Sequence, residues 1–265
     1  MSTPSPFDDA LALMRDLRVR CDWDAAQTHE SLRPYLIEEA HEVDEAIRSG
    51  DDRLLREELG DLLLQVLFHA VLAEERGGFN AGDVPRGLVT KMKGRHPHLY
   101  GEGAKEPWER MKAKRRTSIV DGLPTQLPPL LRAHRLQERA AGVGFDWPST
   151  EGPLEKVAEE LEEVRDTIRD HPPVLAPSGA PEGGPGHDQL TEELGDLLFS
   201  CVNLCRKAGV HAAVALDRSN KKFARRFQTI ERLARERGLV VGQAPLAVLD
   251  ALWDEAKAGE ETPTP

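Results

Sequence analysis

The heptapeptide EELGDLL occurs twice in this chain of 265 residues, at 57–63 and again at 192–198. Each copy leads into a run of apolar residues and carries two carboxylates three positions apart, with a glycine between them. Other short segments recur in the same order, and the offset between the copies varies from 121 to 145 residues. The connecting pieces therefore differ in length while the motifs keep their spacing. A duplicated structural unit whose loops have diverged explains this pattern best.

Four further pairs of segments support the duplication. Trp23 in the segment CDWD corresponds to Trp147 in FDWP, and both precede a predicted helix in a context typical of a turn, so we interpret both as structural. The other pairs are LIEEAHEV (36–43) with VAEELEEV (157–164), TKMKGRHPH (90–98) with NKKFARRFQ (220–228), and WERMK (108–112) with WDEAK (253–257).

The spacing of apolar residues predicts an all-α fold. Positions 54–75 keep helical spacing for about six turns, and no segment alternates like a strand bounded by turn residues. Two segments rich in proline interrupt the pattern, at 121–131 and at 171–189. We therefore predict an N-terminal repeat over 1–120, a linker over 121–131, and a C-terminal repeat over 132–260 that contains a loop over 171–189.

The composition excludes several classes of protein. Charged residues form 31% of the chain and the formal net charge is -11, which argues against a polymeric nucleic-acid partner, because such a partner requires a basic face. The longest apolar run is far short of a membrane span, and the N-terminal residues lack a secretory pattern. We therefore expect a soluble, cytoplasmic protein with no membrane partner. The three cysteines provide no disulfide framework.

Paired carboxylates recur at helical spacing in both halves. Glu39 and Glu42 are three positions apart and therefore lie on one face of a helix, as do Glu58 and Asp61. These acids border the apolar stripe of their helices, where an acid normally requires a partner. If the two helices pack side by side, neighbouring carboxylates roughly 5 Å apart repel by about 3 kcal/mol at an effective dielectric constant of 20. The second half offers the same arrangement through Glu160, Glu163, Glu193 and Asp196.

A divalent cation would remove this repulsion. The candidate ligands are all carboxylate oxygens, which favours Mg²⁺ or Mn²⁺ over Zn²⁺, and magnesium ordinarily shares its coordination with waters and substrate phosphates. Gly60 and Gly195 lie inside the same predicted helices, where glycine costs roughly 1 kcal/mol relative to alanine. We therefore expect a neighbouring helix or the metal cluster to come close to the backbone at both glycines.

Cationic and aromatic residues form a second recurring set. Cations four apart on a helical face suit phosphate oxygens, and a tryptophan one turn from a lysine suits a nucleobase next to a phosphate. Taken alone, each pair is most often solvated surface or core, but recurrence in the same order in both halves favours a function. The pairs are Lys91 with Arg95, Lys222 with Arg226, Trp108 with Lys112, and Trp253 with Lys257.

The order E-x-x-E, spacer, E-x-x-D resembles the signature of the MazG family of nucleoside triphosphate pyrophosphohydrolases, and ELGDLL, RHPH and NKKFARRF are similar to that family's sequences. The resemblance covers nearly the whole chain in a form with two repeats. It implies helical-bundle repeats that assemble as a homodimer, with Mg²⁺ and an NTP or dNTP between the helices. It also implies hydrolysis of the bond between the α and β phosphates to a nucleoside monophosphate and pyrophosphate, a reaction that would clean the nucleotide pool.

The same resemblance assigns roles to individual residues. It implies metal ligands at Glu39, Glu42, Glu58 and Asp61 and at Glu160, Glu163, Glu193 and Asp196. It implies nucleotide contacts at Lys222, Arg226, Trp253 and Lys257, for which Lys91, Arg95, Trp108 and Lys112 are the counterparts in the first repeat.

The catalytic residues are expected next to these ligands. Glu38 and Glu159 each precede the first acid of a pair, about 100° round the helix, and are candidates for the base that activates water. Glu160 is a candidate both as a ligand and as a catalytic residue. We expect the second repeat to carry most of the activity, although 29 residues separate Glu163 from Glu193 while only 15 separate Glu42 from Glu58.

Two other classes of protein remain open. A di-iron carboxylate protein would use E-x-x-H motifs, and Glu38 with His41 forms one, but Glu162 occupies the position of the histidine in the second repeat. A non-catalytic adaptor, whose helices only dimerise and bind nucleotide, would tolerate replacement of the paired glutamates by glutamine.

Overall fold

The computed structural model describes residues 5–105, 108–113, 116–172 and 185–260, and the regular secondary structure in these ranges is helical, without a β-strand. The predicted all-α class is confirmed. The chain divides into two compact units, Met1–Lys105 and Glu106–Pro265. Over the described ranges, no helix is long and apolar enough to cross a bilayer.

The first unit is built around α1 and α4. α1 begins after Ser5, whose hydroxyl accepts the N–H of Asp8 while the Asp8 carboxylate accepts the N–H of Ser5. The apolar faces of the two helices then meet in a core formed by Met14, Leu32, Phe68, Val71 and Leu72. The helices are α1 (Pro6–Arg20), α2 (Asp22–Ala26), α3 (Arg33–Ser49), α4 (Asp52–Glu75), α5 (Asp83–Gly94) and α6 (Pro97–Tyr100).

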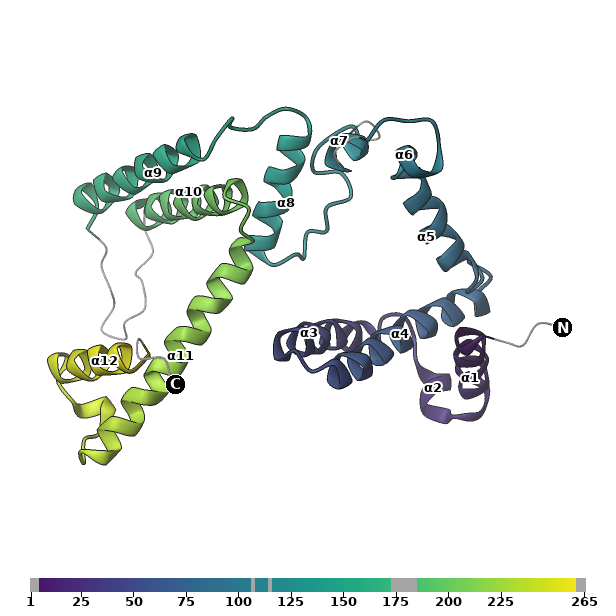
Figure 1. The fold of residues 1–265 in the computed structure, drawn as a ribbon, viewed down its shortest axis with the longest axis horizontal. Helices are drawn as coiled ribbons and strands as arrows, with labels where there is room; N and C mark the ends of the chain where they lie inside the picture. Colours follow the sequence, from purple (N-terminus) through teal and green to yellow (C-terminus); the bar gives the residue numbers. More distant parts are fainter. Residues whose placement is uncertain (1–4, 106–107, 114–115, 173–184, 261–265) are drawn as a thin grey trace. The chain divides into compact units, whose positions relative to one another are not determined.

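α3 and α4 form a helical hairpin, drawn in dark blue in Figure 1. Gly50 ends α3 with a φ of 70°, a left-handed conformation that glycine adopts at little cost. The carboxylate of Asp51 then accepts the N–H groups of Arg53 and Leu54 and so begins α4. This short connection makes the two helices neighbours, and it brings the carboxylates of one helix to the other.

The second unit contains a matching hairpin, in which α9 (Glu151–Asp170) packs on α10 (Pro185–Lys207). α8 (Pro129–Gly142) packs on the other side of α10, where the Gln137 amide donates to the Phe199 carbonyl over 2.8 Å. α11 (Ala212–Glu236) and α12 (Leu246–Glu260) pack on each other through a core of Ile230, Leu233, Ala234 and Leu252. The remaining elements are α7 (Trp108–Ala113) and the short 3₁₀-helix η1 (Val241–Gln243).

The boundary between the units lies earlier than the predicted limit at residue 120. α7 packs on α8 and therefore belongs to the second unit. Glu109 of α7 forms ion pairs with Lys112 (2.9 Å) and Arg116 (3.2 Å). Arg139 of α8 donates to the carbonyl oxygens of Ile119 (2.7 Å) and Asp121 (3.0 Å). These polar contacts, which proline and glycine content does not reveal, attach the predicted linker to α8.

The predicted loop over 171–189 is also shorter at its C-terminal end. α10 begins at Pro185, so 185–189 are helical. Proline is tolerated in the first turn of a helix, because the N–H groups there have no intrahelical acceptor. Residues 173–184 lie outside the described part of the chain.

The segment around Trp147 has a structural role, as expected. A Cβ atom at Gly152 would lie 2.3 Å from the indole ring, so only glycine permits this approach of α9 to Trp147. Asp146 accepts hydrogen bonds from Arg206 (2.5 Å) and Lys207 (3.0 Å), which ties the segment to the end of α10. Trp23 is half exposed and contacts Tyr35 edge-on, with ring centroids 6.2 Å apart.

The expectation of a neighbouring helix close to Gly60 and Gly195 is wrong for the described residues. A Cβ atom added at either glycine meets no atom within 4 Å. Both glycines therefore leave open space beside their helices, and packing within the chain does not explain them.

Candidate functional site

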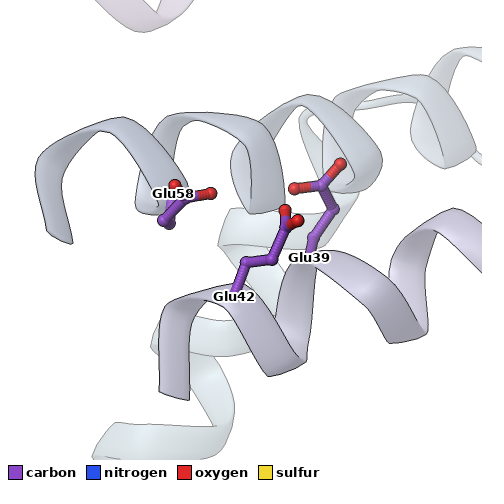
Figure 2. A group of neighbouring side chains, drawn as sticks. All are labelled: Glu39, Glu42 and Glu58. Atoms are coloured by element: carbon purple, nitrogen blue, oxygen red, sulfur yellow. The ribbon is translucent and has the colours of Figure 1, made fainter. Parts of the chain in front are cut away.

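The first group of predicted ligands converges between α3 and α4. Glu39 and Glu42 extend from α3 toward α4, where Glu58 lies (Figure 2). One carboxylate oxygen of each residue lies within 4.8 Å of the other two. We call Glu39, Glu42 and Glu58 the first carboxylate cluster. The i to i+3 spacing on α3 and the turn at Gly50 together produce this convergence.

The electrostatics of the first cluster are unfavourable without a counter-ion. Burial raises the pKa of Glu39, and the charges of Asp61, Glu42 and Glu58 raise it further. Burial and the charges of Glu42 and Asp61 likewise raise the pKa of Glu58. Among the described residues, no lysine or arginine forms an ion pair with these carboxylates. Asp61 is exposed, yet it lies near enough for its charge to act on both glutamates.

The second group of predicted ligands converges between α9 and α10. Glu160, Glu163 and Glu193 also place oxygens within 4.8 Å of one another, and we call them the second carboxylate cluster. Glu160 is buried, with a side chain only 6% exposed. A hydrogen bond to Glu160, burial and the neighbouring carboxylates raise the pKa of Glu163. Asp196 is exposed one turn further along α10 and lies outside the cluster.

A lysine that the sequence analysis did not identify touches the second cluster. Lys156 lies one turn before Glu160 on α9, and its ammonium lies 2.7 Å from Glu160 and 2.8 Å from Glu159. These hydrogen bonds hold the pKa of Lys156 above its ordinary value. The signal was present in the sequence, because a lysine four positions before a buried glutamate reaches it on a helix.

The predicted bases lie beside the clusters. Glu38 is exposed on α3, next to Glu39. Glu159 is exposed on α9, and its carboxylate shares the ammonium of Lys156 with Glu160. Both side chains are accessible to a substrate.

The predicted nucleotide contacts of the second repeat lie on α11 and α12. Arg226 lies over the Trp253 ring at 5.6 Å, and the Phe223 ring lies 5.4 Å from the same ring. Trp253 also packs against the core between α11 and α12. Lys257 is paired with Asp254 at 2.8 Å, and Lys222 is exposed. The structure thus joins Arg226 to Trp253, but it places both on different elements from the second cluster.

The counterparts in the first repeat are separated by the boundary between the units. Lys91 is exposed near the end of α5, and Arg95 follows that helix. Trp108 begins α7 in the second unit, and its side chain lies outside the described part of the structure. Lys112 is half-buried, and its ammonium forms an ion pair with Glu109.

An apolar cavity of about 630 Å³ lies between α8 and α10. Phe145, Trp147 and Phe199 supply aromatic faces, and Asn203 and Gln137 supply amides. The Gln137 Oε1 atom is buried without a hydrogen-bond partner among the described residues. Phe199 follows Asp196 by one turn of α10, so the cavity continues along the helix from the predicted metal ligands.

Both clusters fit a hard divalent cation. Each offers three carboxylate oxygens at close range and no thiolate or imidazole, the donor set that Mg²⁺ and Mn²⁺ prefer. The raised pKa values of Glu39, Glu58 and Glu163 show that these carboxylates lack sufficient compensating charge. The fold and the clusters thus define a class of all-helical proteins with paired carboxylate clusters.

Comparison with known families identifies the chain within that class. The model of the MazG nucleotide pyrophosphohydrolase domain matches residues 27–100 and 149–230, one segment in each unit. Each matched segment contains one carboxylate cluster. The chain belongs to the MazG family, and the predicted resemblance is confirmed.

Curated relatives align with most of the chain. It is 42% identical to a protein from Thermotoga maritima named nucleoside triphosphate pyrophosphohydrolase/pyrophosphatase MazG, over 97% of each chain. It is 38% identical to the nucleoside triphosphate pyrophosphohydrolase of Escherichia coli K12, over 93% of this chain and 94% of the relative. It is 39% identical to the uncharacterized protein YabN of Bacillus subtilis, over 96% of this chain and 52% of that protein.

Proposed function

We propose that this protein hydrolyses nucleoside triphosphates, NTPs or dNTPs, to a nucleoside monophosphate and pyrophosphate. The observation that carries the proposal is the recurrence of three converging carboxylates in both matched segments of a MazG family member. Curated relatives aligned over nearly its whole length are named for this reaction. The biological role that we propose is removal of unwanted nucleotides from the cytoplasmic pool.

The carboxylate clusters would hold Mg²⁺, with Mn²⁺ as a substitute. In the first repeat the ligands would be Glu39, Glu42, Glu58 and Asp61, and in the second Glu160, Glu163, Glu193 and Asp196. When bound, the cations supply positive charge to the triphosphate and increase the acidity of water. Water adds across the bond between the α and β phosphates. Glu159 or Glu38 would receive the proton that this water loses.

Two aromatic groups of the second unit are candidates for holding the nucleobase. Trp253 would stack on the base, and the cationic side chains around it would contact phosphates. These side chains are Lys222, Arg226 and Lys257. The cavity with Trp147 is the alternative, because Phe199 in its lining follows Asp196 by one turn of α10 and its aromatic faces suit a planar ring. Replacing each tryptophan by alanine and measuring KM separates the two, since only the tryptophan that touches the base raises KM strongly.

We also propose that the protein functions as a homodimer. The hairpin of α9 and α10 leaves large apolar side chains at least 40% exposed, an unusual surface for a monomer. A second copy packed on this hairpin would remove them from water and enclose the second cluster. The residues are Leu161, Ile168, Leu194, Leu198 and Phe199.

The metal dependence and the site are tested together. We expect the purified protein to release pyrophosphate from NTPs with Mg²⁺ and to lose this activity in EDTA. Glu193→Gln should lower kcat at least about 100-fold, because it removes a ligand from the second cluster. Glu58→Gln should retain most of the activity, since the second repeat is expected to be the main site.

Glu192→Gln provides the matched control. Glu192 precedes Glu193 on α10, is exposed and lies outside the cluster, so its replacement should leave kcat unchanged. Full activity in Glu193→Gln and in Glu58→Gln would contradict the proposed site. It would favour the adaptor, for which these carboxylates are only surface charges.

A further inference from the structure

A lysine contacts the second carboxylate cluster, whereas no lysine or arginine of the described residues forms an ion pair with the first. The pairing of LIEEAHEV (36–43) with VAEELEEV (157–164) places Tyr35 opposite Lys156. In the second unit the ammonium of Lys156 contacts the buried Glu160 at 2.7 Å and Glu159 at 2.8 Å. In the first unit the side chain of Tyr35 instead lies edge-on to Trp23.

The first cluster therefore has no internal counter-ion. Among the described residues, no cation forms an ion pair with Glu39, Glu42 or Glu58. Their mutual repulsion persists until an external cation binds. In the second cluster, Lys156 already offsets one of the three negative charges and reduces the field on Glu163.

This difference acts directly on a divalent cation. A cation that enters the second cluster competes with the ammonium for an oxygen of Glu160 and is repelled by it at short range. Among the described residues, no ammonium takes the corresponding place in the first cluster, so a cation that enters it meets no such competition. Burial of Glu160 strengthens the effect, because solvent screens the ammonium less there.

We propose that, in the absence of nucleotide, divalent cations bind the first carboxylate cluster more tightly than the second, and that Lys156 causes the difference. The inference rests on the proposed role of both clusters as metal sites. It assigns the first repeat a metal site that fills first, whether or not that repeat hydrolyses nucleotide.

The test measures Mn²⁺ alone, by electron paramagnetic resonance of the free ion, without nucleotide. Glu193→Gln impairs the second cluster and reports on the first, while Glu58→Gln impairs the first and reports on the second. We expect the Kd of Mn²⁺ in Glu193→Gln to be lower than in Glu58→Gln by about tenfold.

Replacement of Lys156 and of Tyr35 tests whether the lysine causes the difference in Mn²⁺ affinity. In the Glu58→Gln background, Lys156→Gln should lower the Kd of Mn²⁺ by about tenfold. Lys156→Arg keeps the positive charge, so the Kd should stay unchanged. In the Glu193→Gln background, Tyr35→Lys should raise the Kd. Lys156 and Tyr35 are both partly exposed, and circular dichroism establishes that each variant is folded.

Two results would overturn the inference, and they have different consequences for the proposed metal sites. Equal affinities of the clusters, or an unchanged Kd in Lys156→Gln, refute the inference but leave both metal sites in place. Absence of Mn²⁺ binding to the unsubstituted protein refutes the metal sites themselves. Pyrophosphate release then decides separately whether the protein hydrolyses nucleotides.

Discussion

At the scale of single residues, two half-buried histidines in the first unit form a hydrogen bond with each other. The Nδ1 atoms of His29 and His69 lie 2.9 Å apart, and the rings are stacked with centroids 5.1 Å apart. Such a hydrogen bond requires one ring to donate and the other to accept. Burial, and secondarily the charge of His29, lower the pKa of His69. The folded protein therefore disfavours protonation of His69.

This pair should make the first unit sensitive to acid. Because the pKa of His69 is lower when folded, the unfolded chain binds more protons, and the free energy of unfolding decreases as the pH falls from about 7 through the ordinary histidine pKa. Thermal unfolding at pH 7.5 and 5.5 should show this decrease, and His69→Gln should make the decrease smaller. An identical pH dependence in His69→Gln would contradict the assignment.

Arg139 is a second residue whose contribution can be measured. It is buried on α8 and donates to the carbonyls of Ile119 and Asp121. Arg139→Met keeps much of the side-chain volume but leaves two carbonyls without these donors, so we expect a loss of about 1 to 3 kcal/mol in denaturant unfolding. Arg165→Met, on the exposed surface of α9, should change stability by less than about 0.5 kcal/mol. Equal effects would show that Arg139 does not anchor this segment.

At the scale of helices, Gly60 and Gly195 weaken α4 and α10. Neither glycine has a neighbour within 4 Å of an added Cβ atom, and neither needs a positive φ. Gly60→Ala and Gly195→Ala should therefore each raise the free energy of unfolding by up to about 1 kcal/mol. Gly50→Ala should lower it, because Gly50 has a φ of 70°. Destabilisation by Gly195→Ala would indicate a neighbour from outside the described chain.

Helical periodicity was sufficient to predict the two hairpins. Residues 54–75, predicted as one helix, form most of α4, and the i to i+3 spacing of Glu39 and Glu42 correctly placed them on one face. Periodicity could not locate the boundary of the first unit. That boundary depends on Glu109, which also pairs with Arg135 of α8 at 3.6 Å, and on Arg139, whose partners are backbone carbonyls.

The candidate site was likewise predicted only in part. Both carboxylate clusters follow from spacing and from the hairpin turn, but the predicted ligands Asp61 and Asp196 are exposed and lie outside the clusters. Lys156 could not be predicted from the features that both repeats share, because the first repeat has Tyr35 at the corresponding position. The contact of Arg226 with Trp253 depends on the packing of α11 on α12, which local sequence patterns do not encode.

At the scale of the whole molecule, the exposed apolar face of α10 gives a test of assembly. Leu198 is 60% exposed, and we place it in the proposed dimer contact. The protein should elute with the mass of a dimer in light-scattering chromatography, and Leu198→Glu should yield a monomer, because it would bury an unpaired charge. Val19→Glu, on the exposed surface of α1, is the control and should remain dimeric. A monomeric unsubstituted protein would contradict the proposed assembly.

The central claim is that the chain cleaves the bond between the α and β phosphates of a nucleoside triphosphate. Phosphorus-31 NMR of a reaction with ATP, or with another NTP or dNTP that is consumed, and Mg²⁺ tests it most directly, since it identifies every phosphate product. We predict a nucleoside monophosphate and pyrophosphate in equal amounts, without a nucleoside diphosphate. Release of orthophosphate with a diphosphate, or no consumption of any triphosphate, would contradict the claim.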